Sequence, residues 1–241
     1  MMWDSVSYFI LVPMVYMAFA ALIIGLIYKL LLVFFSPGMK GITPVFPQKA
    51  PKLLGIITDA FFLPTTFKKQ KIFWFMILIF HIAFVLLFVG HLELIAEFRW
   101  IQVIPHQVFL GAGAIGIILM ITTLYFLFRR FGQPYRRISV PEDYIVLLVL
   151  FFCIMFGSIL HLADRYSDYG SVLHVGVQSY RSYLWGLFTF QPDLSYLISE
   201  TSHFTILVLH VLFANIFLIM FPFTKMVHSV FTFLAHNRKR M

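Results

Sequence analysis

Five long runs of apolar residues dominate this chain and leave few folds open to it. A helix needs about 20 mostly apolar residues to cross the hydrocarbon core of a bilayer. Runs of that length lie near 7–34, 72–97, 107–130, 143–163 and 204–234. They are continuous rather than alternating in ten-residue units, which favours a helical bundle over a membrane barrel. We therefore predict an all-α integral membrane bundle of about five transmembrane helices.

The composition agrees with a chain whose solvent is the bilayer, because 61% of its residues are hydrophobic and only 12% are charged. The first run could instead be a cleaved signal peptide. However, Asp4 stands where a signal peptide has basic residues, and the run is longer than the apolar core of a signal. We expect a retained helix.

The cysteine content excludes several kinds of site. Cys153 is the only cysteine, which excludes a disulfide framework, a C-x-x-C-H haem attachment and a cysteine-ligated iron–sulfur cluster. We expect Cys153 to be a small packed side chain.

The charged residues are sorted between alternate connections. Basic residues fill the connection after the first run, the connection after the third, and the C-terminal tail: Lys40, Lys49, Lys52, Lys68, Lys69, Lys71, Arg129, Arg130, Arg136, Arg137, Arg238, Lys239 and Arg240. The other segments hold mainly acids: Asp4, Glu93, Glu97, Asp164, Asp168, Asp193 and Glu200. By the positive-inside rule the N-terminus lies outside and the C-terminus is cytoplasmic, in the cytoplasmic (inner) membrane. The net charge of +8 therefore reflects topology and predicts no nucleic-acid partner.

Two connections are longer than usual helix-to-helix loops. Residues 36–71 form a Pro/Lys-rich segment, which we expect to be a cytoplasmic docking surface. Residues 164–203 form the outer connection, and the aromatic stretch 171–190 within it suits a helix in the interface plane. The chain shows no internal repeat, which disfavours an inverted-repeat transporter. We treat 1–241 as a single membrane domain.

Histidines inside the apolar runs are the strongest functional signal, because ionisable residues in membrane spans are costly. His81 and His91 lie in the second run, and His210 and His228 in the fifth. Imidazole can ligate haem iron through one nitrogen while the other donates a hydrogen bond that fixes the ring. Two helices with two histidines each could therefore hold two haems across the membrane.

Distances from the flanking charges predict which histidines pair. His81 follows Lys71 and His228 precedes Arg238 by ten residues each, so both lie at similar depth on the cytoplasmic side. His91 and His210 lie toward the outer face. At 1.5 Å rise per residue the two histidines are roughly 15 Å apart on the second helix and 27 Å on the fifth. We expect Pro222 to kink the fifth helix and absorb part of this difference.

The other histidines have plainer interpretations. His203 is the main rival ligand on the fifth helix, although its polar neighbours suggest the membrane interface. His161 could serve a quinone or proton path, but a structural role is favoured. His106, His174 and His236 are expected to be interfacial or exposed.

Two segments resemble a known family. FHIAFVLLFVGH, from Phe80 to His91, and LHVLFANIFLIMFPFTKMVH, from Leu209 to His228, are similar to the cytochrome b (gamma) subunit of respiratory nitrate reductase. The resemblance implies two b haems, with His81 and His228 as axial ligands of the cytoplasm-side haem iron, and His91 and His210 as ligands of the outer one.

A narrower resemblance concerns YRRISVPEDYIVLLV from Tyr135 and YLWGLFTFQPD from Tyr183. These segments are similar to the cytochrome b subunit of Dsr/Hme/Tmc-type membrane redox complexes of sulfate reducers. This implies a cytoplasmic iron–sulfur partner similar to heterodisulfide reductase, and further membrane or periplasmic cytochrome subunits. It also implies menaquinone as a substrate.

A candidate quinone site follows from the same resemblance. Gly90 corresponds to a position associated with quinol access, and helix packing by a small residue is its equal alternative. Glu93 and His106 are candidates for exchanging quinol protons, although solvated loop residues are the favoured interpretation of both.

The predicted function is quinone-linked electron transfer as one subunit of an oxidoreductase complex. The alternatives are a haem-free membrane anchor and a proton-translocating transporter subunit with a histidine relay.

Overall fold

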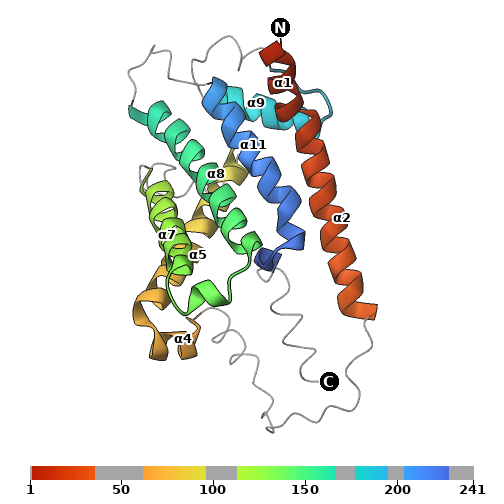
Figure 1. The fold of residues 1–241 in the computed structure, drawn as a ribbon. Coiled ribbons are helices and arrows are strands. Elements are labelled where there is room, and N and C mark those ends of the chain that lie inside the picture. Colours follow the sequence, from red (N-terminus) through yellow and green to blue (C-terminus); the bar gives the residue numbers. More distant parts are fainter. Residues whose placement is uncertain (1, 36–61, 96–112, 167–176, 195–203, 228–241) are drawn as a thin grey trace.

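Every secondary-structure element that the computed structural model describes is helical (Figure 1). The described residues are 2–35, 62–95, 113–166, 177–194 and 204–227. The α-helices are α1 (Met2–Leu11), α2 (Pro13–Phe35), α4 (Pro64–Lys69), α5 (Lys71–Glu93), α7 (Ala114–Phe131), α8 (Pro141–Tyr166), α9 (Val177–Phe188) and α11 (Phe204–Met220). Three 3-10 turns accompany them: η2 (Tyr135–Arg137), η3 (Phe221–Phe223) and η4 (Lys225–Val227). The all-α prediction is confirmed.

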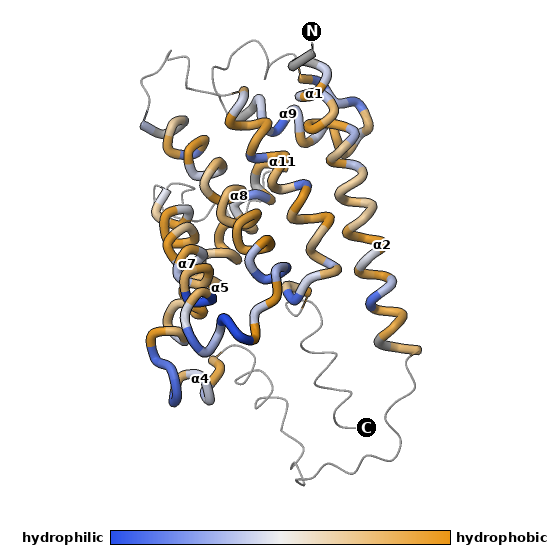
Figure 2. The backbone as a smooth tube through the Cα atoms, viewed as in Figure 1, coloured by the Kyte–Doolittle hydropathy of each residue, from blue (hydrophilic) through white to orange (hydrophobic). Residues whose placement is uncertain are grey.

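Five helical segments are long and apolar enough to cross a membrane, as predicted. They are Ser5–Leu32, Lys71–Leu92, Ala114–Phe131, Pro141–Ala163 and Phe204–Phe223. Large apolar side chains remain on the outer faces of these segments; Ile24 is 67% exposed and Phe128 is 66% exposed. Apolar residues cover the spans, and polar residues gather at their ends (Figure 2). The chain is a multi-pass membrane protein.

Helix α11 lies at the centre of the packing. It packs against α8 and α2, while α8 packs against α7 and α7 against α5 (Figure 1). One buried cluster joins α1, α9 and α11 through Leu11, Tyr183 and Leu207. A second joins α5, α7 and α8 to α11 through Ala83, Leu119 and Leu150. Helix α5 is thus attached to the bundle mainly through α7.

The first span is interrupted at Pro13, where α1 ends and α2 begins. Proline has no N–H to donate and disturbs the preceding turn of a helix. Side chains from other helices bond carbonyls at this break: Asn215 Nδ2 donates to Ile10 at 3.0 Å, and Tyr183 Oη donates to Leu11 at 2.6 Å. Burial, followed by the neighbouring Tyr16, raises the pKa of Tyr183, so its hydroxyl stays a donor. These bonds tie the first span to α9 and α11.

The fifth span ends earlier than the apolar run suggested. Residues 204–234 do not form one kinked helix, because α11 stops at Met220 and the 3-10 turns η3 and η4 follow. Pro222 is buried in η3, and its ring cannot continue an α-helix. A side chain on Gly25 would collide with the Pro222 ring, so α2 crosses this turn at close range. The α-helical rise of about 1.5 Å per residue, assumed in the sequence analysis for this segment, therefore holds only as far as Met220.

The two ends of the bundle differ in charge. We call one the basic end; it comprises α4, η2, η4, the starts of α5 and α8, and the end of α7 (Figure 2). Its cations are Lys68, Lys69, Lys71, Arg129, Arg130, Arg136, Arg137 and Lys225, against Glu142 and Asp143. At the opposite end, α9 occupies part of the stretch where an interfacial helix was expected, and α1 lies beside it (Figure 1).

Asp143 joins three elements at the basic end. Asp143 is 3% exposed, and its carboxylate accepts from Lys225 Nζ at 2.9 and 3.0 Å. Arg130 Nη1 lies 3.0 Å from the same carboxylate, and the Val140 backbone N–H donates to it at 3.2 Å. This node links the end of α7, the start of α8 and the turn η4.

Candidate functional site

Two of the predicted histidines face each other across the bundle. His91 lies in the last turn of α5 and His210 in the first half of α11, and their ring centres are 6.4 Å apart with an interplanar angle of 34°. The main packing of α5 is with α7, whereas that of α11 is with α8 and α2. The rings are therefore brought together from two helices that each pack mainly against other helices.

Both rings are oriented through Nδ1. His91 Nδ1 lies 2.9 Å from the Leu87 carbonyl oxygen, one turn earlier on α5. His210 Nδ1 lies 2.9 Å from the carbonyl oxygen of Cys153 on α8. A carbonyl only accepts, so each Nδ1 carries the proton and each Nε2 presents its lone pair. This tautomer is the one that ligates a metal through Nε2 with a fixed ring orientation.

The spacing of the two rings can be compared with a haem iron bound by both. An imidazole–metal distance of about 2.0 Å, with the ring centre about 1.2 Å beyond the nitrogen, places two opposed ring centres roughly 6.4 Å apart. The 6.4 Å between His91 and His210 fits this arrangement. Two ligands suffice, because a porphyrin supplies the other four. Among the described residues, no group of three or more His, Cys, Asp or Glu side chains gathers into a protein-only metal site.

A glycine on α8 makes room for the His210 ring. A Cβ placed on Gly157 would lie 2.8 Å from His210 Cε1 and 3.0 Å from His210 Nδ1, closer than real Cβ contacts allow. Four residues earlier, Cys153 supplies the carbonyl that accepts from His210, and its Sγ lies 4.0 Å from the same Nδ1. Cys153 and Gly157 together form the cradle of His210.

Sequence reasoning missed this cradle. Cys153 was expected to be only a small packed side chain, and Gly157 was not singled out. Two small residues four positions apart share one helix face and permit close approach of another helix, so their spacing was an available signal. What the spacing does not give is the identity of the ring that fills the space.

His81 lies on α5 ten residues before His91. Its Nδ1 is 2.8 Å from the Ile77 carbonyl oxygen, the same one-turn-earlier bond that His91 makes. Its side chain is exposed on α5. The predicted partner, His228, lies outside the described residues, which end at Val227 of η4.

The remaining predicted residues are distributed as follows. Gly90 is buried in α5, and Glu93 is the last residue of that helix. His161 is half-buried near the end of α8, where its ring lies beside Gly113 at the start of α7. His106, His174, His203 and His236 lie outside the described residues.

Comparison with known proteins finds one family that matches the larger part of the chain. No individually curated protein matches it. A family model described as nitrate reductase gamma subunit matches residues 64–240, a range that contains α4 to α11 and all four predicted histidine ligands. Members of this family are membrane cytochrome b subunits that typically bind b haems and partner with other subunits of a redox complex, which implies a quinone-linked electron-transfer role. The chain belongs to the nitrate reductase gamma subunit family.

Proposed function

We propose that this chain is the dihaem cytochrome b subunit of a respiratory redox complex. It transfers electrons between menaquinone and a cytoplasmic iron–sulfur subunit similar to heterodisulfide reductase, as the likeness to Dsr/Hme/Tmc-type complexes suggests. It acts only as part of that complex, because the remaining substrate chemistry belongs to other subunits.

The observation that carries the proposal is the facing pair His91 and His210. Their 6.4 Å separation and their Nδ1 bonds to carbonyl oxygens suit two axial ligands of one haem. When bound, a haem supplies a one-electron carrier. The protein's own contribution is to fix the orientation of the two ligand rings through their Nδ1 bonds.

A second haem is assigned to His81 and His228. His81 has the same Nδ1 bond as His91 and lies about 15 Å from it along α5, toward the basic end. Two haems at these levels would divide the path across the membrane into shorter steps.

We propose that the basic end faces the cytoplasm, in accordance with the positive-inside rule. The His91–His210 haem then lies near the outer face, where menaquinol gives up or takes up electrons. Gly90, Glu93 and His106 are the candidates for admitting the quinol and exchanging its protons. The iron–sulfur partner would dock at the basic end.

Haem content and its spectrum test the proposal directly. The chain is purified in mild detergent after expression with ample haem, and a pyridine haemochrome counts haem per polypeptide. We expect two b haems per chain, both reduced by a menaquinol analogue. A well-folded preparation without haem would support a haem-free anchor or a histidine relay instead.

Single variants then assign the ligands. His91→Gly or His210→Gly should remove one b haem and leave the other, and added imidazole should restore it because it can replace the lost ring. His161→Gln is the matched control, since it changes a half-buried histidine outside the proposed ligand sets. Two haems retained in either glycine variant without imidazole would overturn the assignment.

A further inference from the structure

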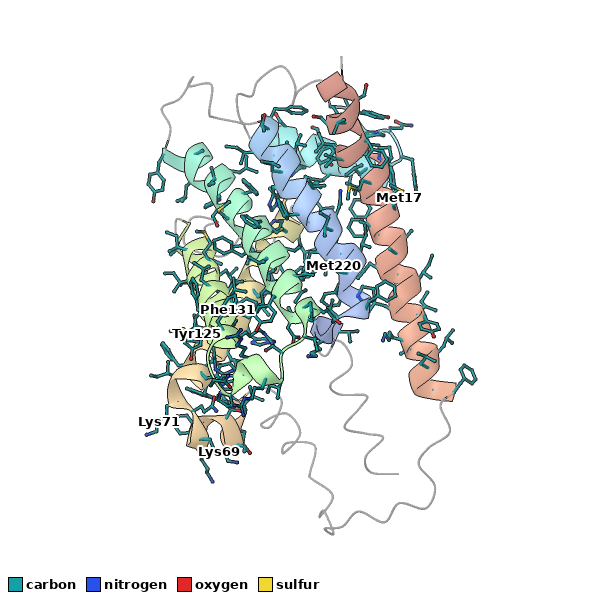
Figure 3. The ribbon with its side chains drawn as sticks, in the orientation of Figure 1. Met17, Lys69, Lys71, Tyr125, Phe131 and Met220 are labelled. Carbon is teal, nitrogen blue, oxygen red and sulfur yellow. The ribbon has the colours of Figure 1, made fainter. Side chains whose placement is uncertain are left out.

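A groove of about 520 Å³ opens at the basic end, remote from the His91–His210 pair. Gln70, Lys71, Ile72 and Phe73 line it from the start of α5, and Tyr125 and Arg129 from the last turns of α7. In Figure 3, Lys69, Lys71 and Tyr125 lie close to this end of the two helices. Both helices are membrane spans, so the groove lies at the level of lipid headgroups.

Arg129 is held rigidly beside the groove. Its Cζ lies 3.7 Å from the centre of the Phe73 ring and 3.5 Å from that of Tyr135, so the guanidinium is sandwiched between the two rings. Arg129 Nη2 donates to Gln70 Oε1 at 2.6 Å, and Gln70 Nε2 donates to the Tyr135 hydroxyl at 2.8 Å. Stacking covers the faces of a guanidinium and leaves its edge donors, which suit the oxygens of a phosphate.

No acid among the described residues neutralises the positive charge of the groove. Neither Lys71 nor Arg129 forms an ion pair with an acid in the part of the chain that the structure describes. The buried acid at this end, Asp143, is already bound by Arg130 and Lys225. The groove therefore presents two available cations to an anionic ligand.

The apolar surroundings indicate what kind of anion fits. Tyr125 belongs to a stripe on α7 with Ile117, Ile121 and Phe128, spaced as residues on one helix face. Ile121 is 56% exposed and Phe128 is 66% exposed. A charged groove that continues into an exposed apolar stripe along a membrane span matches a headgroup with its acyl chain better than it matches an acidic peptide.

We propose that this groove binds the phosphate headgroup of an anionic phospholipid, with Arg129 and Lys71 on the phosphate and the α7 stripe along an acyl chain. Basic pockets between spans are a recognised form of lipid site. The site is separate from the proposed haem sites and does not depend on them.

Lipid retention by the purified full chain tests this proposal. Native mass spectrometry in mild detergent measures binding of phosphatidylglycerol, with phosphatidylcholine and inorganic phosphate as separate probes. We expect saturable phosphatidylglycerol binding that is at least about tenfold tighter than phosphatidylcholine binding. Removing each cation should weaken it roughly fivefold, so Lys71→Gln combined with Arg129→Gln should weaken it about 25-fold.

The control variant removes the same charge elsewhere on the basic end. Arg136→Gln combined with Arg137→Gln should leave phosphatidylglycerol binding unchanged, because neither residue lines the groove. Circular dichroism confirms that each variant is folded.

If both double variants weakened phosphatidylglycerol binding equally, the loss would reflect the net charge of the basic end and not the groove, and the proposal would be overturned. Displacement of the lipid by inorganic phosphate at comparable concentration would identify a free-anion site instead. If Lys71→Gln combined with Arg129→Gln weakened the binding of a partner subunit but kept the lipid bound, the proposal would also be overturned.

Discussion

The ring of His210 touches the backbone of α8 at Gly157, where no side chain has room. A Cβ there would lie 2.8 Å from His210 Cε1. We therefore expect Gly157→Ala to push the ring away from the Cys153 carbonyl, at a cost of about 1–3 kcal/mol for overpacking. The measurable result is lower occupancy or a shifted reduction potential of the haem assigned to His91 and His210, with the other haem unchanged.

Gly132 provides the matched control for this substitution. It follows α7 in an extended conformation, and a Cβ there would approach only the Arg129 carbonyl, at 3.6 Å. Gly132→Ala should therefore leave both haems as they are. Unaltered haem content and potentials in Gly157→Ala would show that the cradle does not position His210.

At the residue scale, the candidate histidines could be singled out from the sequence, whereas their surroundings could not. Histidines in long apolar runs stand out because burying an ionisable group is costly. The spacing of Cys153 and Gly157 shows that another helix can approach closely, but not that the His210 ring fills the space, because that contact forms only when α8 and α11 pack together. Interhelical contacts of this kind depend on helix rotation, which hydropathy does not specify.

At the scale of elements, the node at Asp143 connects the end of α7, the start of α8 and the turn η4, which the hydropathy pattern gives no reason to connect. Replacing Asp143 by Asn removes the charge that binds Arg130 and Lys225. Losing hydrogen bonds to a buried charged group costs about 1.5–3 kcal/mol. We expect the lower part of this range, because the Lys225 side chain is 66% exposed and solvent screens it. The measurement is the midpoint of thermal unfolding in detergent.

The matched control is Glu142→Gln, which removes the same charge one residue earlier in the first turn of α8. It should change the unfolding midpoint far less, since Glu142 is only half-buried. The turn η4 leads directly to His228, so Asp143→Asn should also perturb the basic-end haem. Equal midpoints for the two variants would mean that the node contributes little.

The ends of the elements were the least predictable part of the fold. The fifth apolar run continues past Pro222, but α11 stops at Met220 because proline cannot extend the helix. A proline that kinks a helix and a proline that ends one cannot be told apart from the local sequence. The close approach of Gly25 to Pro222 comes from α2, about 200 residues earlier, and no local pattern contains it.

At the scale of the whole molecule, the charges set one end of the bundle apart from the other. The cations of the basic end surround α4, η2 and η4, while α1 and α9 cover the opposite end (Figure 2). If the basic end faces the cytoplasm, the proposed lipid groove, the partner surface and the His81 haem lie on the same side. The His91–His210 haem then lies nearest to the outer quinone.

This orientation predicts which exposed sites a membrane-impermeant maleimide can reach in intact cells. Ser182, exposed on α9, and Lys69, exposed on α4, mark the two ends. We expect Ser182→Cys to be labelled in intact cells, and Lys69→Cys only after the membrane is permeabilised. The native Cys153 is half-buried inside the α8 span, so the unsubstituted chain gives the background. Labelling of Lys69→Cys but not Ser182→Cys in intact cells would reverse the orientation and place the His91–His210 haem beside the cytoplasm.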